Sequence, residues 1–242
     1  MPVPVTMRAM STPNLLLLCL PAAGGGASIY TRWSAVLAPT VGVRPVTLPG
    51  RERLISEAPL RDCATLIDRL LPDVASQLDR PYAIFGHSMG ALVAFELTHA
   101  LRQAGHPEPT CLVLSGYPAV TIPRRGPAIH DASEDVVIDA LRGFGGVPNE
   151  VLAIRDYRDY MLPLARADLA VIETYRYTPR PHLTCPVFAV GGEHDRTCPP
   201  EELEAWRDQT TGAFNRRLFP GGHFYLFEGP QFLEFLRTTL AS

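Results

Sequence analysis

The 242-residue sequence has few cysteines, little net charge and no long apolar run, and each shortage excludes a class of protein. There are five cysteines, an odd number, and no two of them form a C-x-x-C pair, which argues against a disulfide-stabilised secreted protein. We therefore expect buried, reduced thiols in a cytoplasmic protein. No stretch approaches the roughly 18 apolar residues of a membrane span. The net charge of −3 comes without a basic block, so neither nucleic acid nor a membrane is an expected partner.

Two further absences concern cofactors. The seven histidines show no metal-ligand spacing, and no glycine fingerprint of a dinucleotide site occurs. We therefore expect no metal and no cofactor.

What the sequence does contain is an alternation of short apolar runs with helical periodicity. The apolar runs predict strands at 15–20, 82–85, 110–114 and 186–190, and we interpret 43–48 and 214–219 as two further strands. Helical patterns between them predict helices near 28–37, 60–78, 89–101, 201–210 and 231–240. This order predicts an α/β fold with a mostly parallel sheet and helices on both of its faces.

The pattern changes between residues 119 and 180, where no strand is predicted. Helices are expected near 133–141, 149–160 and 162–175. We interpret 119–180 as a helical lid inserted into a core made of 14–118 and 181–242, with 1–13 as a loose leader. The alternative is a set of packed helices without a gating role.

One motif carries a specific chemical signal. Gly86-His87-Ser88-Met89-Gly90 follows an apolar strand and opens a helix, which is the context of a nucleophile elbow. We expect Ser88 at the apex of a strained turn, with the side chain of His87 pointing away across the turn. The alternative for a bare G-x-S-x-G is an ordinary βα turn.

A serine nucleophile needs a base, and the base needs an orienting acid. In α/β-hydrolases the chain order is nucleophile, acid, histidine. His223 is the histidine that follows a candidate acid on a strand-ending loop. For the acid we favour Asp195, directly after a predicted strand, over its neighbour Glu193 and over Asp208 on a predicted helix.

The expected oxyanion hole uses two backbone N–H groups. Met89 follows the nucleophile and supplies the first. The second comes from the small-residue loop after the first strand, where we favour Ala23, with Ala22 as the fallback. Read alone, this loop would be a flexible turn.

Longer motifs make the sequence resemble one family, the type II thioesterases that accompany polyketide and nonribosomal peptide synthases. These enzymes have the α/β-hydrolase fold. The motifs are Cys19-Leu20-Pro21-Ala22-Ala23-Gly24-Gly25, Trp33, Leu48-Pro49-Gly50-Arg51-Glu52, the elbow, Gly145-Gly146-Val147-Pro148, Leu162-Pro163-Leu164-Ala165-Arg166-Ala167-Asp168, Gly191 to Asp195, and Gly221-Gly222-His223-Phe224-Tyr225-Leu226. Together they extend almost end to end.

The resemblance implies a serine thioesterase that hydrolyses acyl groups from the phosphopantetheine arm of acyl or peptidyl carrier proteins. Such enzymes remove aberrant or stalled units or release intermediates. It also implies that Leu162, Pro163, Arg166 and Asp168 shape the substrate chamber. In one departure, Leu54 stands where the family commonly has a second arginine, which puts any role of that arginine in doubt.

Two other functions stay open at this point. An acyltransferase or a small-ester hydrolase would use the same three side chains. A non-catalytic module that binds carrier proteins would keep the fold alone, and the intact set of Ser88, Asp195 and His223 argues against it. We expect a monomer.

Overall fold

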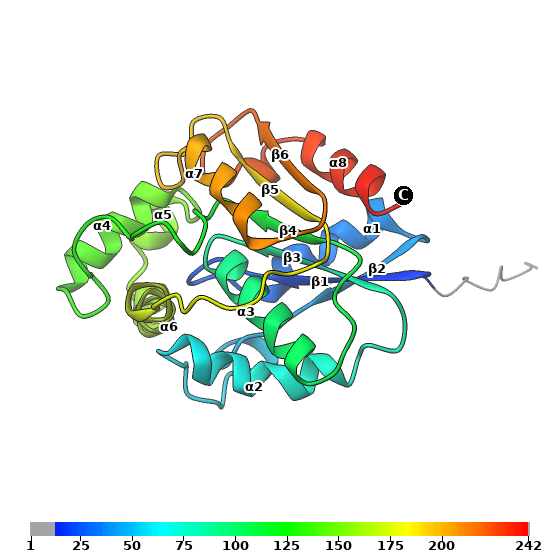
Figure 1. Ribbon diagram of the computed structural model, residues 1–242. Coiled ribbons are helices and arrows are strands. Elements are labelled where there is room, and N and C mark those ends of the chain that lie inside the picture. The colour runs from blue at the N-terminus through cyan, green and yellow to red at the C-terminus, as the bar shows by residue number, and fades with distance from the viewer. Residues whose placement is uncertain (1–12, 242) are drawn as a thin grey trace, which may run out of the picture.

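A six-stranded parallel sheet forms the centre of the computed structural model, which describes residues 13–241 (Figure 1). The strand order is β2-β1-β3-β4-β5-β6. The strands are β1 (Leu15–Leu20), β2 (Val41–Pro45), β3 (Tyr82–His87), β4 (Leu112–Ser115), β5 (Val187–Gly192) and β6 (Phe214–Phe219). The predicted sheet is therefore confirmed. Of the predicted leader, residues 1–12 lie outside the described part.

Most of the strands are apolar because helices cover both faces of the sheet, whereas the edge strand β6 exposes Asn215, Arg216 and Arg217. Side chains alternate between the faces of a strand, so Leu16 and Leu18 of β1 enter one core cluster while Leu17 and Cys19 enter the other. All four are buried. A strand covered on one side only would have polar residues at every second position.

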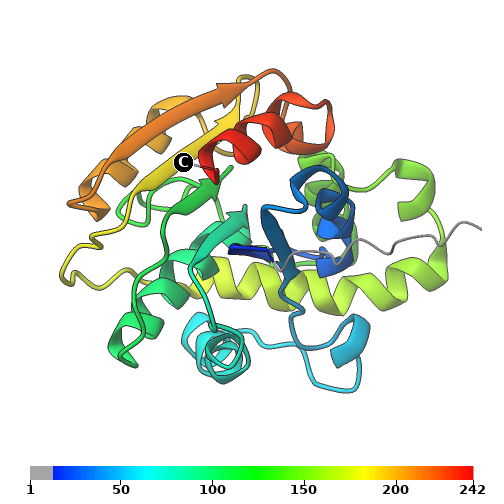
Figure 2. The ribbon, with the colours of Figure 1, turned by 90° about the vertical axis from the view of Figure 1, so that its right-hand side faces the viewer.

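Figure 2 shows α1 and α8 on one face of the sheet and α2 and α3 on the other. The α-helices are α1 (Ser34–Leu37), α2 (Cys63–Ala75), α3 (Met89–Gln103), α4 (Glu134–Phe144), α5 (Asn149–Leu152), α6 (Arg155–Thr174), α7 (Pro200–Glu204) and α8 (Gln231–Thr239). Short 3-10 helices occupy Ala27–Trp33, Glu52–Leu54, Ala205–Gln209 and Tyr225–Phe227. No helix of residues 13–241 is long and apolar enough to cross a bilayer.

Two predicted boundaries were wrong. The strand expected at 43–48 is shifted, since β2 begins at Val41 and ends at Pro45. The helices expected at 149–160 and 162–175 are divided elsewhere, because α6 continues through Pro163. Proline removes one backbone hydrogen bond from a helix. The buried neighbours Met161, Leu164 and Ala165 hold α6 against the rest of the protein despite that loss.

The segment between β4 and β5 holds α4, α5 and α6 and, as described, no strand. Val137 and Leu141 of α4 and Leu152 of α5 pack on Met161 and Ala165 of α6 in a small apolar cluster of their own. Figure 1 shows α4 and α5 beyond the edge of the sheet, while α6 also contacts α2 and α3. Helix α6 thus connects the outer helices to the core.

Parallel strands place all their carboxyl ends at one edge of the sheet, where ligands of such folds bind. The loops that leave this edge carry Ala23 after β1, Ser88 after β3, Asp195 after β5 and His223 after β6. The fold therefore brings four distant segments to one edge.

Candidate active site

Ser88 lies at the apex of a tight turn between β3 and α3. Its backbone has φ 54° and ψ −122°, a conformation that a residue with a side chain rarely adopts. The turn needs glycine on both sides: a Cβ on Gly86 would lie 2.0 Å from the carbonyl oxygen of Gly90, and a Cβ on Gly90 would lie 2.3 Å from that of Leu20. The expected nucleophile elbow is present, and it touches the end of β1.

Asp195 and His223 form a hydrogen-bonded pair at the same edge. Nδ1 of His223 lies 2.7 Å from Oδ2 of Asp195. The other carboxylate oxygen accepts hydrogen bonds from the backbone N–H groups of Thr197 and Cys198 and from the Thr197 hydroxyl. Burial would raise the pKa of Asp195, but the hydrogen bonds from His223 and Thr197 outweigh it and hold that pKa below its ordinary value. The carboxylate is thus kept charged beside the imidazole.

Ser88 and His223 line one cavity of about 760 Å³. Within residues 13–241 the Ser88 hydroxyl has no hydrogen-bond partner, so the structure does not itself join it to His223. Such contacts are often long without substrate and tighten when it binds.

His87 is a part of the site that the sequence interpretation missed. We expect its side chain to point away across the turn, and His87 indeed does not line the cavity beside Ser88. What the sequence did not predict is that its ring packs on that of His223, with the two centroids 4.9 Å apart. Its Nδ1 lies 2.9 Å from the hydroxyl of Ser115, which lies 2.7 Å from that of Tyr225. Burial, and then the charge of His223, lowers the pKa of His87 well below its ordinary value. A neutral His87 ring therefore supports His223. The sequence signal that could have indicated this role is the position of His87 as the last residue of β3.

The loop after β1 forms a tight turn beside the elbow. The N–H of Gly25 donates to the carbonyl of Ala22 at 2.9 Å, and Gly24 has a φ of +72°, which favours glycine. In such a turn the N–H of the second residue, here Ala23, takes no part in the closing bond. Met89 is the first residue of α3, so its N–H has no partner inside the helix.

The four residues expected to shape the substrate chamber do not line the cavity beside Ser88. Leu162, Pro163 and Arg166 line a separate hollow. Asp168 is 2% exposed and contacts Arg51 and the backbone of Gly24. The residues of α6 that do line the cavity come later in the helix, at Leu169, Ile172 and Glu173.

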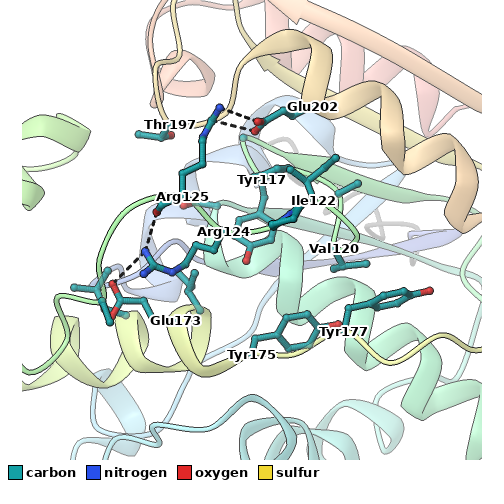
Figure 3. A pocket seen from close by; sticks show the side chains of 18 of the residues that line it. Tyr117, Val120, Ile122, Arg124, Arg125, Glu173, Tyr175, Tyr177, Thr197 and Glu202 are labelled. Carbon is teal, nitrogen blue, oxygen red and sulfur yellow. Dashed lines mark hydrogen bonds and ion pairs between the residues drawn. The ribbon is translucent and has the colours of Figure 1, made fainter.

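The cavity walls are mostly apolar and aromatic, with charged pairs beside them. Figure 3 shows Tyr117 and Ile122 from the chain after β4 and Tyr175 and Tyr177 from the chain after α6 around this space. It also shows Arg125 paired with Glu202 and Arg124 with Glu173. A further lining residue, Arg196, is exposed. The space is in the size range of small-molecule sites.

In the described chain no group of three or more histidine, cysteine or acidic side chains is arranged to hold a metal ion. The groups that the structure places at this edge are a hydroxyl, an imidazole, a carboxylate and the backbone N–H groups of Met89 and Ala23. That set suits nucleophilic acyl transfer.

Comparisons with known proteins agree with this chemistry. The model of the thioesterase domain family matches residues 16–240. The gramicidin S biosynthesis protein GrsT of Aneurinibacillus migulanus is 35% identical over 96% of this chain and 91% of its own. Two solved structures are each 37% identical. The type II thioesterase BorB of the borrelidin biosynthetic cluster has a TM-score of 0.86 over 96% of both chains. RedJ, a thioesterase from the prodiginine pathway of Streptomyces coelicolor, has 0.89 over 98% of this chain and 96% of its own.

Proposed function

The chain belongs to the thioesterase family, and from that premise we propose that Ser88, His223 and Asp195 are its catalytic residues. The substrates we propose are acyl groups on the phosphopantetheine arm of acyl or peptidyl carrier proteins of polyketide or nonribosomal peptide synthases. The observation that carries the proposal is the Asp195–His223 pair opening on the cavity that also exposes Ser88 at its strained turn. The names of GrsT, BorB and RedJ support the pathway.

The first step forms an acyl-enzyme. Nε2 of His223 takes the proton of Ser88 as its oxygen attacks the thioester carbonyl. The backbone N–H groups of Met89 and Ala23 stabilise the oxyanion, and removing one such donor costs about 3 kcal/mol. The C–S bond then breaks, and His223 gives its proton to the departing pantetheine sulfur.

The second step frees the serine. His223 removes a proton from water, the hydroxide attacks the acyl-serine carbonyl, and Ser88 recovers its proton as the acid leaves. Asp195 keeps Nδ1 of His223 protonated and stabilises the imidazolium, so Nε2 faces the reacting atoms. No metal or redox group is needed for this balance.

The arginines along the cavity support a phosphorylated substrate arm. Arg124 and Arg125 pair with carboxylates, and Arg176 donates to backbone carbonyls. Arg196 has no ion pair or hydrogen bond among the described residues. Guanidinium groups bind phosphate well. We place the phosphate of the pantetheine arm near Arg196.

Two substrates that differ only in this phosphate, an acyl-phosphopantetheine and the matching acyl-pantetheine, test whether Arg196 binds the phosphate. We expect Arg196→Gln to raise KM severalfold for an acyl-phosphopantetheine and to leave KM for the acyl-pantetheine unchanged. Equal effects on both substrates would contradict this placement. Arg207→Gln is the matched control, since Arg207 is exposed and pairs with Glu204 away from the cavity lining.

The reaction class has its own test. We expect an acyl-carrier protein to be hydrolysed faster than the acyl-CoA, and both faster than the oxygen ester of the same acyl group. A preference for the oxygen ester, or transfer to an added alcohol in place of hydrolysis, would contradict a thioester hydrolase acting on carriers. Labelling by a serine-directed phosphonate that is lost in Ser88→Ala would exclude a non-catalytic binding module.

The same proposal includes a lid, a monomeric state and a cytoplasmic location. Residues 119–180, which contain α4, α5 and α6, act as a lid over a monomeric α/β core of residues 14–118 and 181–242. The protein works in the cytoplasm with its synthase, and five buried cysteines without disulfides fit a reducing compartment. The role is to clear aberrant or stalled acyl units or to release intermediates.

A further inference from the structure

We propose that Arg51 and Asp168 are positioning residues that set the oxyanion-hole N–H of Ala23. They act by tying the loop after β1 to helix α6. This inference rests on the function proposed above. The two residues are 117 positions apart, and each is 2% exposed.

The pair is bidentate and holds the loop directly. Nη1 and Nη2 of Arg51 donate to the two oxygens of Asp168 at 2.7 and 2.8 Å. Oδ2 of Asp168 also accepts the backbone N–H of Gly24 at 2.7 Å. Nη1 of Arg51 donates to the carbonyl of Gly25 at 2.9 Å. Both residues that follow Ala23 are thus fixed by one buried ion pair.

The next residue holds the far end of the same loop. The carboxylate of Glu52 accepts the N–H groups of Ala27 and Ser28 at 3.1 and 2.9 Å. Glu52 has a φ of +49°, a strained conformation for a residue with a side chain, and the hydrogen bonds fix it there. The Pro49-Gly50-Arg51-Glu52 motif therefore contacts the loop at both ends of its glycine run.

Positioning matters because an oxyanion donor works over a short distance. A donor must lie about 2.7–3.1 Å from the oxyanion, so a small shift removes much of its effect. A loop of three consecutive glycines, Gly24 to Gly26, does not fix Ala23 through its own backbone preferences. Asp168 and Arg51 supply that restraint from outside. Because Asp168 belongs to α6, its hydrogen bonds fix the position of the oxyanion loop relative to the helix that forms one wall of the cavity.

The variant Asp168→Ala tests the inference, measured on an acyl-N-acetylcysteamine thioester at a temperature where it is folded. We expect kcat to fall about tenfold or more, less than the ~10²–10³-fold of losing a donor outright, with KM within about twofold. Affinity for a trifluoromethyl ketone analogue, which forms a tetrahedral adduct, should fall by the same factor. Affinity for the unreactive thioether analogue should not change. Asp168→Asn, which keeps an acceptor for Gly24, should recover part of kcat.

Glu108→Ala is the matched control. Glu108 also pairs with an arginine, Arg102, and accepts the backbone N–H groups of Thr184 and Cys185, but at the opposite edge of the sheet. We expect it to lower thermal stability and leave kcat unchanged. A kcat for Asp168→Ala equal to that of Glu108→Ala would overturn the inference, as would equal losses of affinity for the two analogues.

A double variant covers the case in which Asp168→Ala does not fold. Replacing both partners of a buried ion pair with apolar residues often preserves stability. Arg51→Met with Asp168→Leu should therefore fold and still show the low kcat, and a wild-type kcat would overturn the inference.

Phosphonate labelling separates the two proposals: normal labelling of Ser88 with unchanged kcat in the variants overturns the positioning role alone. Hydrolysis by a wild-type enzyme that is not labelled at Ser88 overturns the proposed function and the positioning role with it.

Discussion

The histidine side of the Ser88 site and the oxyanion-loop side are each held by one buried carboxylate, but the two carboxylates do different things. In the proposed mechanism Asp195 orients an imidazole that takes up and releases a proton, and the remaining hydrogen bonds of Asp195 come from its own loop. Asp168 orients a backbone turn, and its partner Arg51 comes from a distant loop. In the proposed mechanism the histidine side moves protons, and the oxyanion-loop side holds fixed backbone donors in place.

This difference predicts different losses when each carboxylate is removed. Asp195→Asn keeps the shape of the side chain but no longer favours the catalytic tautomer of His223. We expect kcat to fall about 10⁴-fold with the fold intact, as in other triads. Kinetics and circular dichroism would measure this. A loss under tenfold would show that the histidine is oriented by another group.

Removing an ion-pair partner on the oxyanion-loop side should lower the free energy of unfolding more than a substitution on the histidine side. Arg51→Met leaves the charge of Asp168 buried without its ion-pair partner, which typically costs about 3–5 kcal/mol. Urea unfolding would measure the change. Thr197→Val on the histidine side serves for comparison, because it leaves the ion pair of Asp195 in place. Equal unfolding free energies for Arg51→Met and wild type would contradict the account.

Two buried histidines, His87 on the histidine side and His99 on α3 outside the site, should also make stability depend on pH. The pKa of His87 is lowered well below its ordinary value by burial and His223, and burial and then Arg180 lower the pKa of His99 to about 3. An unfolded histidine gains a proton below about pH 6.5, whereas these buried rings stay neutral. Stability should therefore be lost as pH falls below about 6.5. For His99 the loss continues down to about pH 3, which is its pKa in the folded protein.

Thermal unfolding between pH 7 and 4 would measure that slope. We expect His87→Gln to flatten it, and His99→Gln, outside the site, to flatten it too. An unchanged slope in His87→Gln would show that this ring does not resist protonation in the folded protein.

The smallest expected effect belongs to Thr197. Its hydroxyl donates to Asp195 at 2.7 Å and lies 2.9 Å from Nδ1 of His223. Thr197→Val removes one hydrogen bond worth about 1 kcal/mol and keeps the shape, so kcat should fall about fivefold. A loss as large as that of Asp195→Asn would mean that Thr197 has a catalytic role.

The same comparison explains what the sequence could predict. Ser88 and Asp195 each follow an apolar strand, and His223 follows the last strand in the chain order expected of a triad. Parallel strands end at one edge, so these local patterns were enough to propose the three residues. His87 was missed because its orientation depends on Ser115 and Tyr225, which meet it only in the folded sheet.

Arg51 and Asp168 show what local patterns could not reveal. A charged residue in a helix usually lies in solvent, and neither sequence neighbourhood indicates that a buried partner lies 117 positions away. The prediction of the chamber residues rests on the family resemblance, which does not say which turns of α6 line the cavity. Periodicity predicts that α6 is amphipathic but not which turns of it meet the cavity, and these are the turns of Leu169 and Ile172 rather than that of Leu162.

Mass spectrometry of the intact protein, quenched within milliseconds of mixing with an acyl-phosphopantetheine, tests the central claim most directly. We predict an adduct of one acyl mass that peptide mapping assigns to Ser88, decays as free acid appears and is absent in Ser88→Ala. An adduct on another residue, or undiminished hydrolysis by Ser88→Ala, would contradict the account.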